Sequence, residues 1–389
     1  MIYNLLQSWH DWLESFGGYS LLQVLYQIEF RAFFAVILSF SIVLLLGERT
    51  IRWLLKQKLG DSPEFYNADL NQLMASKANV PTMGGILIVF SILVSTCLLA
   101  DMFNDYVHIS LVVLLWLAIL GGVDDWLKLT TARRRPGARE GLFAWEKFLF
   151  QIGIGVIAGM YLWRLTGDSQ SAMVLNLPFQ RTYEPGTEGL ILEQGVIVLT
   201  WLPFVVIATL WIAGTSNAVN ITDGMDGLVS GLMLIAALAM MLLAYIAGSS
   251  GRAQYMLFPF VDGSEELMVV AGSIAGACLG FLWFNCAPAR VFMGDTGSLP
   301  LGGLLALIAC ALRQEIMLVV IGAVFYWELL SVMLQVAYFR VTGGKRIFRC
   351  SPIHHHFHLG GWSESQIVSR FWILGVVAVV VAAVLLKLR

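Results

Sequence analysis

The sequence predicts an all-α polytopic membrane protein with about ten transmembrane helices. Of its 389 residues, 58% are hydrophobic and only 13% are charged, whereas soluble domains carry about 25% charged residues. Repeated apolar runs are long enough to cross a hydrocarbon core of about 30 Å. The net charge of −2 says nothing about nucleic acid by itself, but the sequence has no long basic run, and nucleic acid is not expected as a partner.

The apolar runs set the order of segments along the chain. Residues 1–30 carry tryptophan and tyrosine among leucine and acidic residues, which is typical of an interfacial helix outside the membrane. Ten is an even number of spans, so both termini are expected on the same side. No low-complexity linker divides the chain, and 1–389 is interpreted as one membrane domain. The predicted spans are 32–47, 84–100, 106–123, 148–165, 195–213, 227–248, 266–284, 299–312, 316–338 and 367–386.

Lysine and arginine predict the orientation of these spans. They gather in the connections 48–83, 124–147 and 339–366, whereas the alternate connections are mainly acidic. Because basic connections stay in the cytoplasm, these three are expected inside and both termini outside. The outer connection 166–194 could hold a short hairpin, and 339–366 forms a cytoplasmic loop rich in histidine.

Neither the cysteines nor the N-terminus indicates a secreted protein. The five cysteines show no CxxC pairing, and most lie in apolar segments, so they are interpreted as packing residues instead of a disulfide or metal framework. The N-terminus lacks a basic region before its apolar residues, so a cleaved signal peptide is not expected. The first spans would direct the chain to the membrane.

The segment from Asn217 to Leu228 carries the densest polar cluster between two predicted spans. Its polar side chains recur every third residue, and on a helical turn this spacing stacks them on one side. Carboxylates beside a membrane are costly unless they have a function, and this set suits a hard cation or a phosphate-bearing ligand. A helix N-cap explains any one of them but not four in register: Asn217, Asn220, Asp223 and Asp226.

Two further cytoplasmic connections carry charged candidates. Lys77 precedes a Pro-Thr-Met-Gly-Gly entry into the second span and could neutralise a phosphate, although a lysine at a membrane edge is also an orientation signal. Asp124 and Asp125 end the third span, where paired acids suit Mg²⁺ or a general base. Two solvated acids beside Lys128 are the alternative.

The connection before the eighth span repeats the pairing of aspartate with glycine. Asp295 stands between two glycines, Ser298 could cap the helix, and Phe292 could stack on a flat ring. An N-cap role for Asp295 is the alternative. The recurrence of aspartate beside glycine at three cytoplasmic ends favours a functional site, because no outer connection shows a comparable motif.

Four of the six histidines fall between His354 and His358. Consecutive histidines cannot easily face one zinc ion together, and no cysteine completes a tetrahedral set. Binding a phosphate or polarising a leaving group is the favoured interpretation. Glu328 lies well inside the ninth predicted span, where an acid indicates a function or pairs with a buried partner.

These motifs together resemble those of the polyprenyl-phosphate N-acetylhexosamine-1-phosphate transferases. The resemblance covers essentially all ten spans and has highly specific motifs. The three consecutive histidines and the Pro-Thr-Met-Gly-Gly entry resemble the muramoyl branch instead of the GlcNAc-1-phosphate branch. The motifs are 81–85, Asp124-Asp125, 217–227, 292–295 and His354-His355-His356.

The resemblance implies a reaction and a location. Undecaprenyl phosphate is expected to attack the β-phosphate of UDP-N-acetylmuramoyl-pentapeptide, releasing UMP and forming the first lipid intermediate of peptidoglycan, with Mg²⁺ required. Direct attack and an aspartyl-phosphate intermediate both stay open. The expected location is the bacterial inner membrane, and a homodimer is an open possibility.

The resemblance also assigns roles to individual residues. Asp124, Asp125 and Asp295 are the expected catalytic residues, with Asp295 and Asp124 as metal ligands. One of His354 and His356 is expected to brace the loop, because consecutive side chains cannot all touch one ligand. The expected substrate-binding residues are Lys77, Thr82, Asn217, Asn220, Asp223, Asp226, Asn285, Phe292, Ser298, Gln335, His354, His355 and His356.

The sequence departs from the family pattern at three places. His358 stands where a glutamate is expected, Met225 where leucine is usual, and Glu140 where a lysine commonly precedes Gly-Leu. Two alternative functions stay open at this point. One is transfer of GlcNAc-1-phosphate to the same lipid, and the other is a cation-coupled transporter. A transporter usually places its acids near the midplane of the bilayer, whereas these acids cluster at one face.

Overall fold

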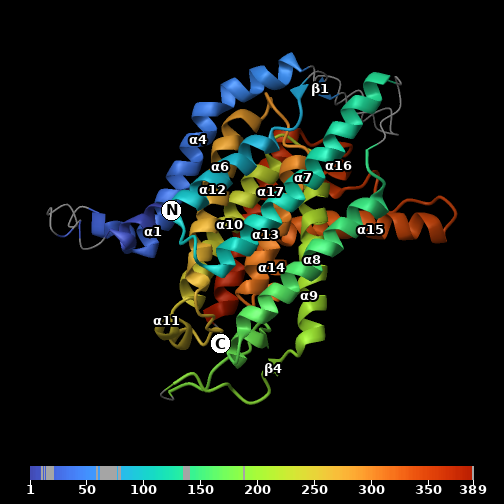
Figure 1. Ribbon diagram of the computed structural model, residues 1–389. Helices are drawn as coiled ribbons and strands as arrows, with labels where there is room; N and C mark the ends of the chain where they lie inside the picture. Colours follow the sequence, from blue (N-terminus) through green and yellow to red (C-terminus); the bar gives the residue numbers. More distant parts are fainter. Residues whose placement is uncertain are drawn as a thin grey trace.

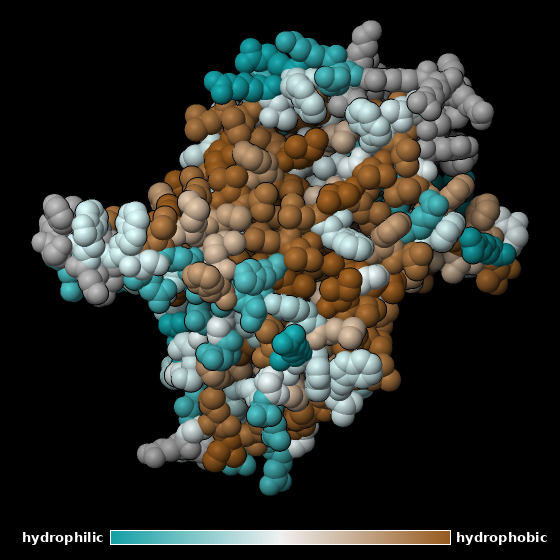
Figure 2. All heavy atoms as spheres, viewed as in Figure 1, coloured by the Kyte–Doolittle hydropathy of each residue, from teal (hydrophilic) through white to brown (hydrophobic). Residues whose placement is uncertain are grey.

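The protein is a bundle of membrane-spanning helices. In the residues that the computed structural model describes, eight helices are long and apolar enough to cross a membrane, and two shorter apolar helices accompany them. Figure 2 shows a broad hydrophobic band with hydrophilic residues gathered at the ends of the molecule. The predicted all-α polytopic class is therefore confirmed. The described residues are 1–9, 12, 14, 22–57, 60–61, 77, 80–134, 141–186 and 189–387.

Ten long helices make up most of the described chain (Figure 1). They are α4 (Ile28–Lys56), α6 (Gly85–Leu99), α7 (Asp105–Arg134), α8 (Ala144–Thr166), α9 (Trp201–Thr222), α10 (Leu228–Ala247), α12 (Leu267–Asn285), α13 (Asp295–Ala311), α15 (Ala323–Val341) and α17 (Glu364–Lys387). The short helices are α1 (Ile2–Ser8), η1 (Gln23–Tyr26), η3 (Gln170–Met173), α11 (Ser250–Tyr255), η4 (Ser264–Glu266), α14 (Glu315–Ile321) and α16 (Ile353–His358).

Two pairs of very short strands accompany the helices. β1 (Gly60–Asp61) pairs with β2 (Val80–Pro81), and β3 (Val174–Leu175) pairs with β4 (Ile197–Val198), both antiparallel. The partner of β3 therefore lies just beyond the connection 166–194 in which a hairpin was expected. Of the expected interfacial helix, α1 is described, but residues 10–11, 13 and 15–21 lie outside the described residues.

Two predicted spans differ from the observed helices. The run 316–338 is not one helix, because it is interrupted at Gly322 between α14 and α15. Glycine is a poor helix former and provides the break. α15 then projects from the side of the bundle (Figure 1). The helix expected from 195 begins instead at Trp201, after β4, and continues to Thr222, so that it includes Asn217 and Asn220.

The short helix α13 forms the centre of the bundle. Every residue from Thr296 to Ala311 is buried, which agrees with a helix that is apolar all round. α13 packs against α7 on one side and α9 on another, while α12 packs between α4 and α10. Close packing depends on small residues: a Cβ on Gly276 of α12 would lie 2.1 Å from the carbonyl oxygen of Val36 in α4.

A buried ion pair joins three helices at the end of the bundle where α4 and α12 begin. Both guanidinium nitrogens of Arg31 donate to the carboxylate of Glu266, at 2.8 Å and 2.6 Å. Arg31 also donates to the carbonyl of Leu99 at the end of α6. Arg31 and Glu266 are 3% and 4% exposed, so each charge depends on the other for compensation.

We predict that Glu266→Ala lowers stability by roughly 3–5 kcal/mol, because it leaves the Arg31 charge buried without its partner. The measurement is thermal unfolding of the purified protein in detergent, with Asp262→Ala as control, because Asp262 is exposed in the same connection. Equal unfolding temperatures for the two variants would show that the pair does not hold α4 to α12.

Candidate active site

Three carboxylates meet where α7 approaches the start of α13. Asp124, Asp125 and Asp295 each place an oxygen within 4.8 Å of the others. Asp124 is 0% exposed and Asp125 is 4% exposed. The two helices approach closely because Gly121 has no side chain: a Cβ there would lie 2.1 Å from the carbonyl oxygen of Asp295. The sequence therefore brings its three expected catalytic residues into one cluster, which we call the carboxylate cluster.

Two lysines neutralise the carboxylate cluster. The ammonium group of Lys128 lies 2.6 Å from Asp124 and 3.2 Å from Asp295. That of Lys147, at the start of α8, lies 3.1 Å from each of the same carboxylates. The N–H of Leu142 also donates to Asp124 at 2.7 Å. Three negative charges so close together need this compensation, because charge repulsion is strong away from water.

Asp125 has a different set of partners from Asp124. Its carboxylate accepts the backbone N–H groups of Asp295 and Thr296, at 3.2 Å and 2.9 Å. It also accepts the hydroxyl of Thr296 at 2.7 Å. These donors belong to the first turn of α13, whose N-terminus favours a negative charge. Asp125 therefore holds the start of α13, and with it Asp295, in place.

The helix α9 contributes amides to the same cluster. The side-chain amide of Asn220 donates to Asp295 at 2.7 Å and to the hydroxyl of Ser298 at 2.9 Å. Asn217 lies one turn earlier and donates to Gln151 of α8 at 2.7 Å. Asn220 therefore contacts the carboxylate cluster directly and Ser298 contacts it through Asn220, whereas Asn217 joins α9 to α8.

A second charged group lies beside the turn between α9 and α10. Lys77 forms ion pairs with Asp226 and with Glu364 at the start of α17, both at 2.5 Å. The N–H of Asp226 donates to Glu364 at 2.8 Å, and Asp226 accepts the N–H of Ala289 at 2.9 Å. The ammonium of Lys77 lies 5.9 Å from the centre of the Phe292 ring. Lys77, Asp226 and Phe292 are thus neighbours, and Glu364 joins them.

Asn285 and Thr82 brace the backbone near these groups. The carboxamide oxygen of Asn285 accepts the N–H of Gly227 at 3.0 Å, and its amide donates to Val291 at 2.9 Å. Thr82 is buried and lies next to Gly294, where a Cβ would come within 3.0 Å of its hydroxyl. Asn285 therefore holds the turn that carries Asp226, whereas Thr82 packs beside the glycine that precedes Asp295.

Asp223 lies in the turn that follows α9 and is only half-buried. Burial, followed by the negative charges of Asp295 and Asp125, raises the pKa of Asp223 to about 7. A hydrogen bond from the backbone of Gly294 acts in the opposite direction. Asp223 therefore lies close enough to the carboxylate cluster for the charges to interact.

His354 is paired with the acid inside the ninth predicted span. Its ring nitrogen Nδ1 lies 3.2 Å from Glu328 of α15, and both side chains are 0% exposed. The other nitrogen, Nε2, faces Gly224, where a Cβ would lie only 2.4 Å away. The ring of His354 is therefore enclosed between Glu328 and the turn that carries Asp223 and Asp226. His354 supports this turn by packing against it.

The other residues of the histidine connection differ in their contacts. His356 accepts the N–H of Arg349 at 3.1 Å through Nδ1, so it braces the loop. Gln335 accepts the N–H groups of Ile347 and Phe348, both at 3.0 Å, in the same loop. His355 is 4% exposed, and burial, followed by the charge of His354, lowers its pKa to about 2. His355 is therefore neutral at physiological pH.

Sequence reasoning missed three residues of this site. Lys147 was noted only as part of a basic connection, yet it contacts two of the three clustered carboxylates. Glu364 is the first residue of α17 and Gln151 lies within α8. Both are distant in sequence from the residues that they contact. A signal existed for Lys147, because it is a lysine directly before a predicted span. No local sequence pattern marks Glu364 or Gln151 as part of the site.

Among the departures from the family pattern, Glu140 lies outside the described residues.

The carboxylate cluster is suited to a divalent metal ion. Its donors are all carboxylate oxygens, which Mg²⁺ prefers, and two ammonium groups already lie between Asp124 and Asp295. The site therefore already accommodates positive charge where an ion would bind. Asp124 and Asp295 face these cations, whereas Asp125 is bonded to the N-terminus of α13.

Comparison with known proteins gives consistent matches. Residues 107–313 match the model of glycosyl transferase family 4. The chain is 40% identical over 390 residues to phospho-N-acetylmuramoyl-pentapeptide-transferase of Desulfotalea psychrophila, and this match covers 100% of each chain. It is 42% identical over 371 residues to the protein of the same name from Oleidesulfovibrio alaskensis, covering 95% of this chain and 96% of that one. A third protein of that name, from Desulfosudis oleivorans, is 40% identical over 390 residues and covers both chains completely.

We predict that Gly224→Ala destabilises the protein by roughly 1–3 kcal/mol, because the added methyl group must displace the buried ring of His354. Gly214→Ala is the matched control, since a Cβ there meets nothing within 4 Å. The measurement is thermal unfolding of both variants. If Gly224→Ala unfolds at the same temperature as the control, His354 does not pack tightly against this turn.

Proposed function

Because the chain belongs to glycosyl transferase family 4, we propose that it is the transferase that its full-length relatives are named for. It transfers phospho-N-acetylmuramoyl-pentapeptide from a UDP-linked donor to a membrane lipid, which is the first membrane step of peptidoglycan synthesis. The observation that carries the proposal is the carboxylate cluster, located at the ends of helices in a chain that matches these relatives over its whole length. The lipid is undecaprenyl phosphate and the protein lies in the bacterial inner membrane.

The reaction exchanges one phosphorus–oxygen bond for another. A phosphate oxygen of the acceptor bonds to the β-phosphorus of UDP-N-acetylmuramoyl-pentapeptide, the bond from that phosphorus to the bridging oxygen breaks, and UMP leaves with the electron pair. Both substrates are anionic, so the protein must supply positive charge. Lys128 and Lys147 lie beside the carboxylate cluster, and Lys77 lies beside Asp226 and Phe292.

Mg²⁺ is proposed as the cofactor, held by Asp295 and Asp124. When bound, it offsets the negative charge of the diphosphate and of the leaving UMP. Asp125 positions Asp295 by accepting backbone N–H groups from the first turn of α13. Asn220 donates to Oδ1 of Asp295, whereas the two lysines contact Oδ2. This arrangement gives Asp124 and Asp125 different roles: Asp124 faces the cations, and Asp125 orients its neighbour.

The remaining expected residues divide into contacts and supports. Lys77, Asp223, Asp226, Phe292 and His355 are proposed to bind the nucleotide-sugar. Neutral His355 can still donate one N–H to a phosphate oxygen. The others act as supports in this proposal. Hydrogen bonds hold Asn217, Asn285, Ser298, Gln335 and His356, whereas Thr82 packs beside Gly294 and His354 lies against Glu328.

The basic connections place the carboxylate cluster on the cytoplasmic side in this proposal, where the soluble nucleotide is made available. The proposed oligomeric state of the enzyme is a homodimer. Transfer of GlcNAc-1-phosphate is disfavoured by the names of the relatives, and the substrate comparison described below tests it.

We predict that Asp295→Asn inserts and folds normally but reduces UMP release by at least about 100-fold, because the cluster loses a charged ligand. Removing divalent ions with a chelator should stop UMP release by the unaltered protein, and Mg²⁺ should restore it. Asp262→Asn, exposed on another connection, is the control and should behave like the unaltered protein. Near-normal turnover by folded Asp295→Asn would rule out the proposed metal site.

We predict that His355→Ala strongly impairs UMP release from UDP-N-acetylmuramoyl-pentapeptide, whereas His358→Glu is tolerated. Because the lowered pKa keeps His355 neutral, the defect should be equally large from about pH 6 to about pH 8. Rates are measured with the muramoyl donor and with UDP-GlcNAc. An active His355→Ala protein would remove His355 from the site, and an unaltered protein that prefers UDP-GlcNAc would favour the other branch.

A further inference from the structure

Lys77 is held by two carboxylates that belong to different parts of the chain. Its ammonium donates to Asp226, in the turn before α10, and to Glu364, the first residue of α17, both at 2.5 Å. The side chains of Lys77, Asp226 and Glu364 are only 11%, 5% and 18% exposed. Water and salt therefore screen these contacts much less than contacts at the surface, and the ion pairs hold the ammonium in place.

One oxygen of Glu364 joins this lysine to the turn before α10. Oε1 accepts the ammonium of Lys77 and also the backbone N–H of Asp226, the latter at 2.8 Å. Asp226 uses one oxygen for Lys77 and the other for the N–H of Ala289, at 2.9 Å. Glu364 thus fixes Lys77 relative to the turn that carries Asp226, and Ala289 fixes that turn relative to the connection before α13.

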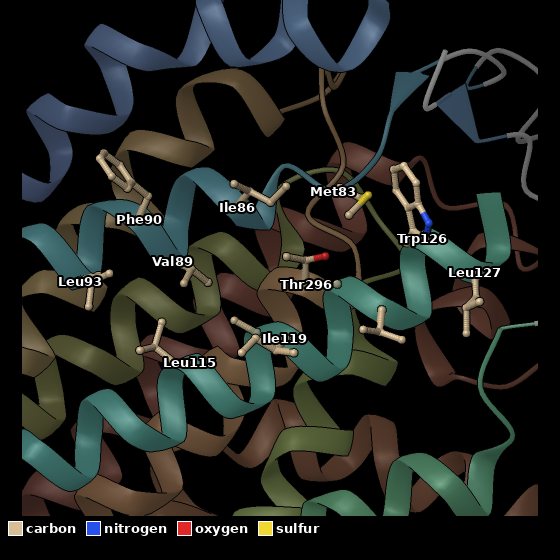
Figure 3. A pocket seen from close by; sticks show the side chains of 13 residues that line it. Met83, Ile86, Val89, Phe90, Leu93, Leu115, Ile119, Trp126, Leu127 and Thr296 are labelled. Atoms are coloured by element: carbon tan, nitrogen blue, oxygen red, sulfur yellow. The ribbon is translucent and has the colours of Figure 1, made fainter. Parts of the chain in front are cut away.

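The backbone beyond Lys77 is anchored to the same connection. The N–H of Phe292 donates to the carbonyl of Pro81 at 2.8 Å. Met83, just before α6, and Thr296, in the first turn of α13, line the same apolar surface (Figure 3). These contacts place the segment after Lys77 beside the start of α13, but they do not orient the Lys77 side chain. The two carboxylates do.

Two fixed partners determine the direction of a lysine ammonium, which has three N–H donors. With Asp226 as its partner alone, the ammonium could swing about one contact. Glu364 supplies the second contact from another helix, so the direction of the third N–H follows from the geometry. The centre of the Phe292 ring lies 5.9 Å from the same nitrogen. Glu364 therefore sets how Lys77 lies relative to a second residue that is proposed to bind the nucleotide-sugar.

We propose that Glu364 is a positioning residue for the binding of the nucleotide-sugar and acts through Lys77. The inference rests on the proposed function, in which Lys77 contacts this anionic substrate. Glu364 keeps its place without Lys77, because the N–H of Asp226 also binds it. It is therefore an anchor for the lysine and not a counter-ion that moves with it. A negative charge next to a diphosphate is unfavourable, so Glu364 acts on the substrate only through the lysine.

The test compares two substitutions, alone and together, in the purified full-length protein. Glu364→Gln keeps an oxygen that can accept the N–H of Asp226 but removes the charge that holds Lys77. Lys77→Met removes the ammonium and keeps an unbranched side chain. Glu48→Gln is the matched control, because it also breaks a carboxylate–cation pair, with Arg290, and both of those side chains are about half exposed.

UMP release is measured with increasing UDP-N-acetylmuramoyl-pentapeptide and, separately, with increasing undecaprenyl phosphate. Glu364→Gln should raise the KM for the nucleotide-sugar roughly tenfold, because a small displacement of a contacting group removes much of its effect. The KM for undecaprenyl phosphate and kcat should stay within about threefold of the control. In the Lys77→Met protein, adding Glu364→Gln should change the KM for the nucleotide-sugar less than about twofold, since the residue through which it acts is gone.

A second variant keeps the test decisive if Glu364→Gln does not fold. Glu364→Asp retains a negative charge at the N-terminus of α17, where it is favourable, but its side chain is shorter. It should raise the KM for the nucleotide-sugar by a smaller factor than Glu364→Gln and leave the KM for undecaprenyl phosphate unchanged. Thermal unfolding of each variant shows whether it is folded.

The outcomes separate this inference from the proposed function. If the unaltered protein releases no UMP, the proposed function fails and the inference fails with it. If UMP is released but the Glu364 variants keep the control's KM, only the assignment of Glu364 is overturned. A lower KM would overturn it as well, because Glu364 would then compete with the substrate for Lys77. An equal effect of Glu364→Gln with and without Lys77 would show that Glu364 does not act through this lysine.

Discussion

The structure depends on compensation of negative charge where helices meet away from water. Three carboxylates within 4.8 Å of one another would repel strongly without partners. Their partners come from four helices: Lys128 from α7, Lys147 from α8, Asn220 from α9 and the N-terminal N–H groups of α13. These helices must therefore converge at one point, and the small residues where α7 meets α13 permit it. The arrangement that makes the charges tolerable also gathers three carboxylates where they could hold a metal ion.

A second set of interactions connects this centre to the C-terminal part of the chain. Glu364 of α17 contacts both Lys77 and the backbone of Asp226, while Glu328 of α15 pairs with His354 beneath the same turn. Glu364 thus reaches residues of the first connection and of the turn after α9, and Glu328 reaches the histidine that packs against this turn. The turn carrying Asp223 and Asp226 is consequently supported from both sides, which suits a site where ligand contacts need fixed positions.

The sequence predicted the helices and the identity of the clustered acids because both depend on local signals. Apolar runs mark the spans, and aspartate beside glycine marks the helix ends. It could not predict the break at Gly322, because a single glycine inside an apolar run does not reveal whether neighbouring helices keep the helix straight. Nor could it predict the Arg31–Glu266 pair or the contacts of Glu364, which join residues far apart in the chain. Asp124 and Asp125 have different partners because of where α13 lies: Asp124 contacts the lysines and Asp125 accepts from the N-terminus of α13. No local sequence pattern indicates that position.

The location of the acids also separates an enzyme from a transporter. An acid within a span would suit an ion pathway, and Glu328 is such an acid, but it is fully buried and paired with His354. Beyond Asp295, α13 carries no further acid and is buried from Thr296 to Ala311, so the carboxylate cluster lies at the end of this helix and not along a row of acids through the bundle.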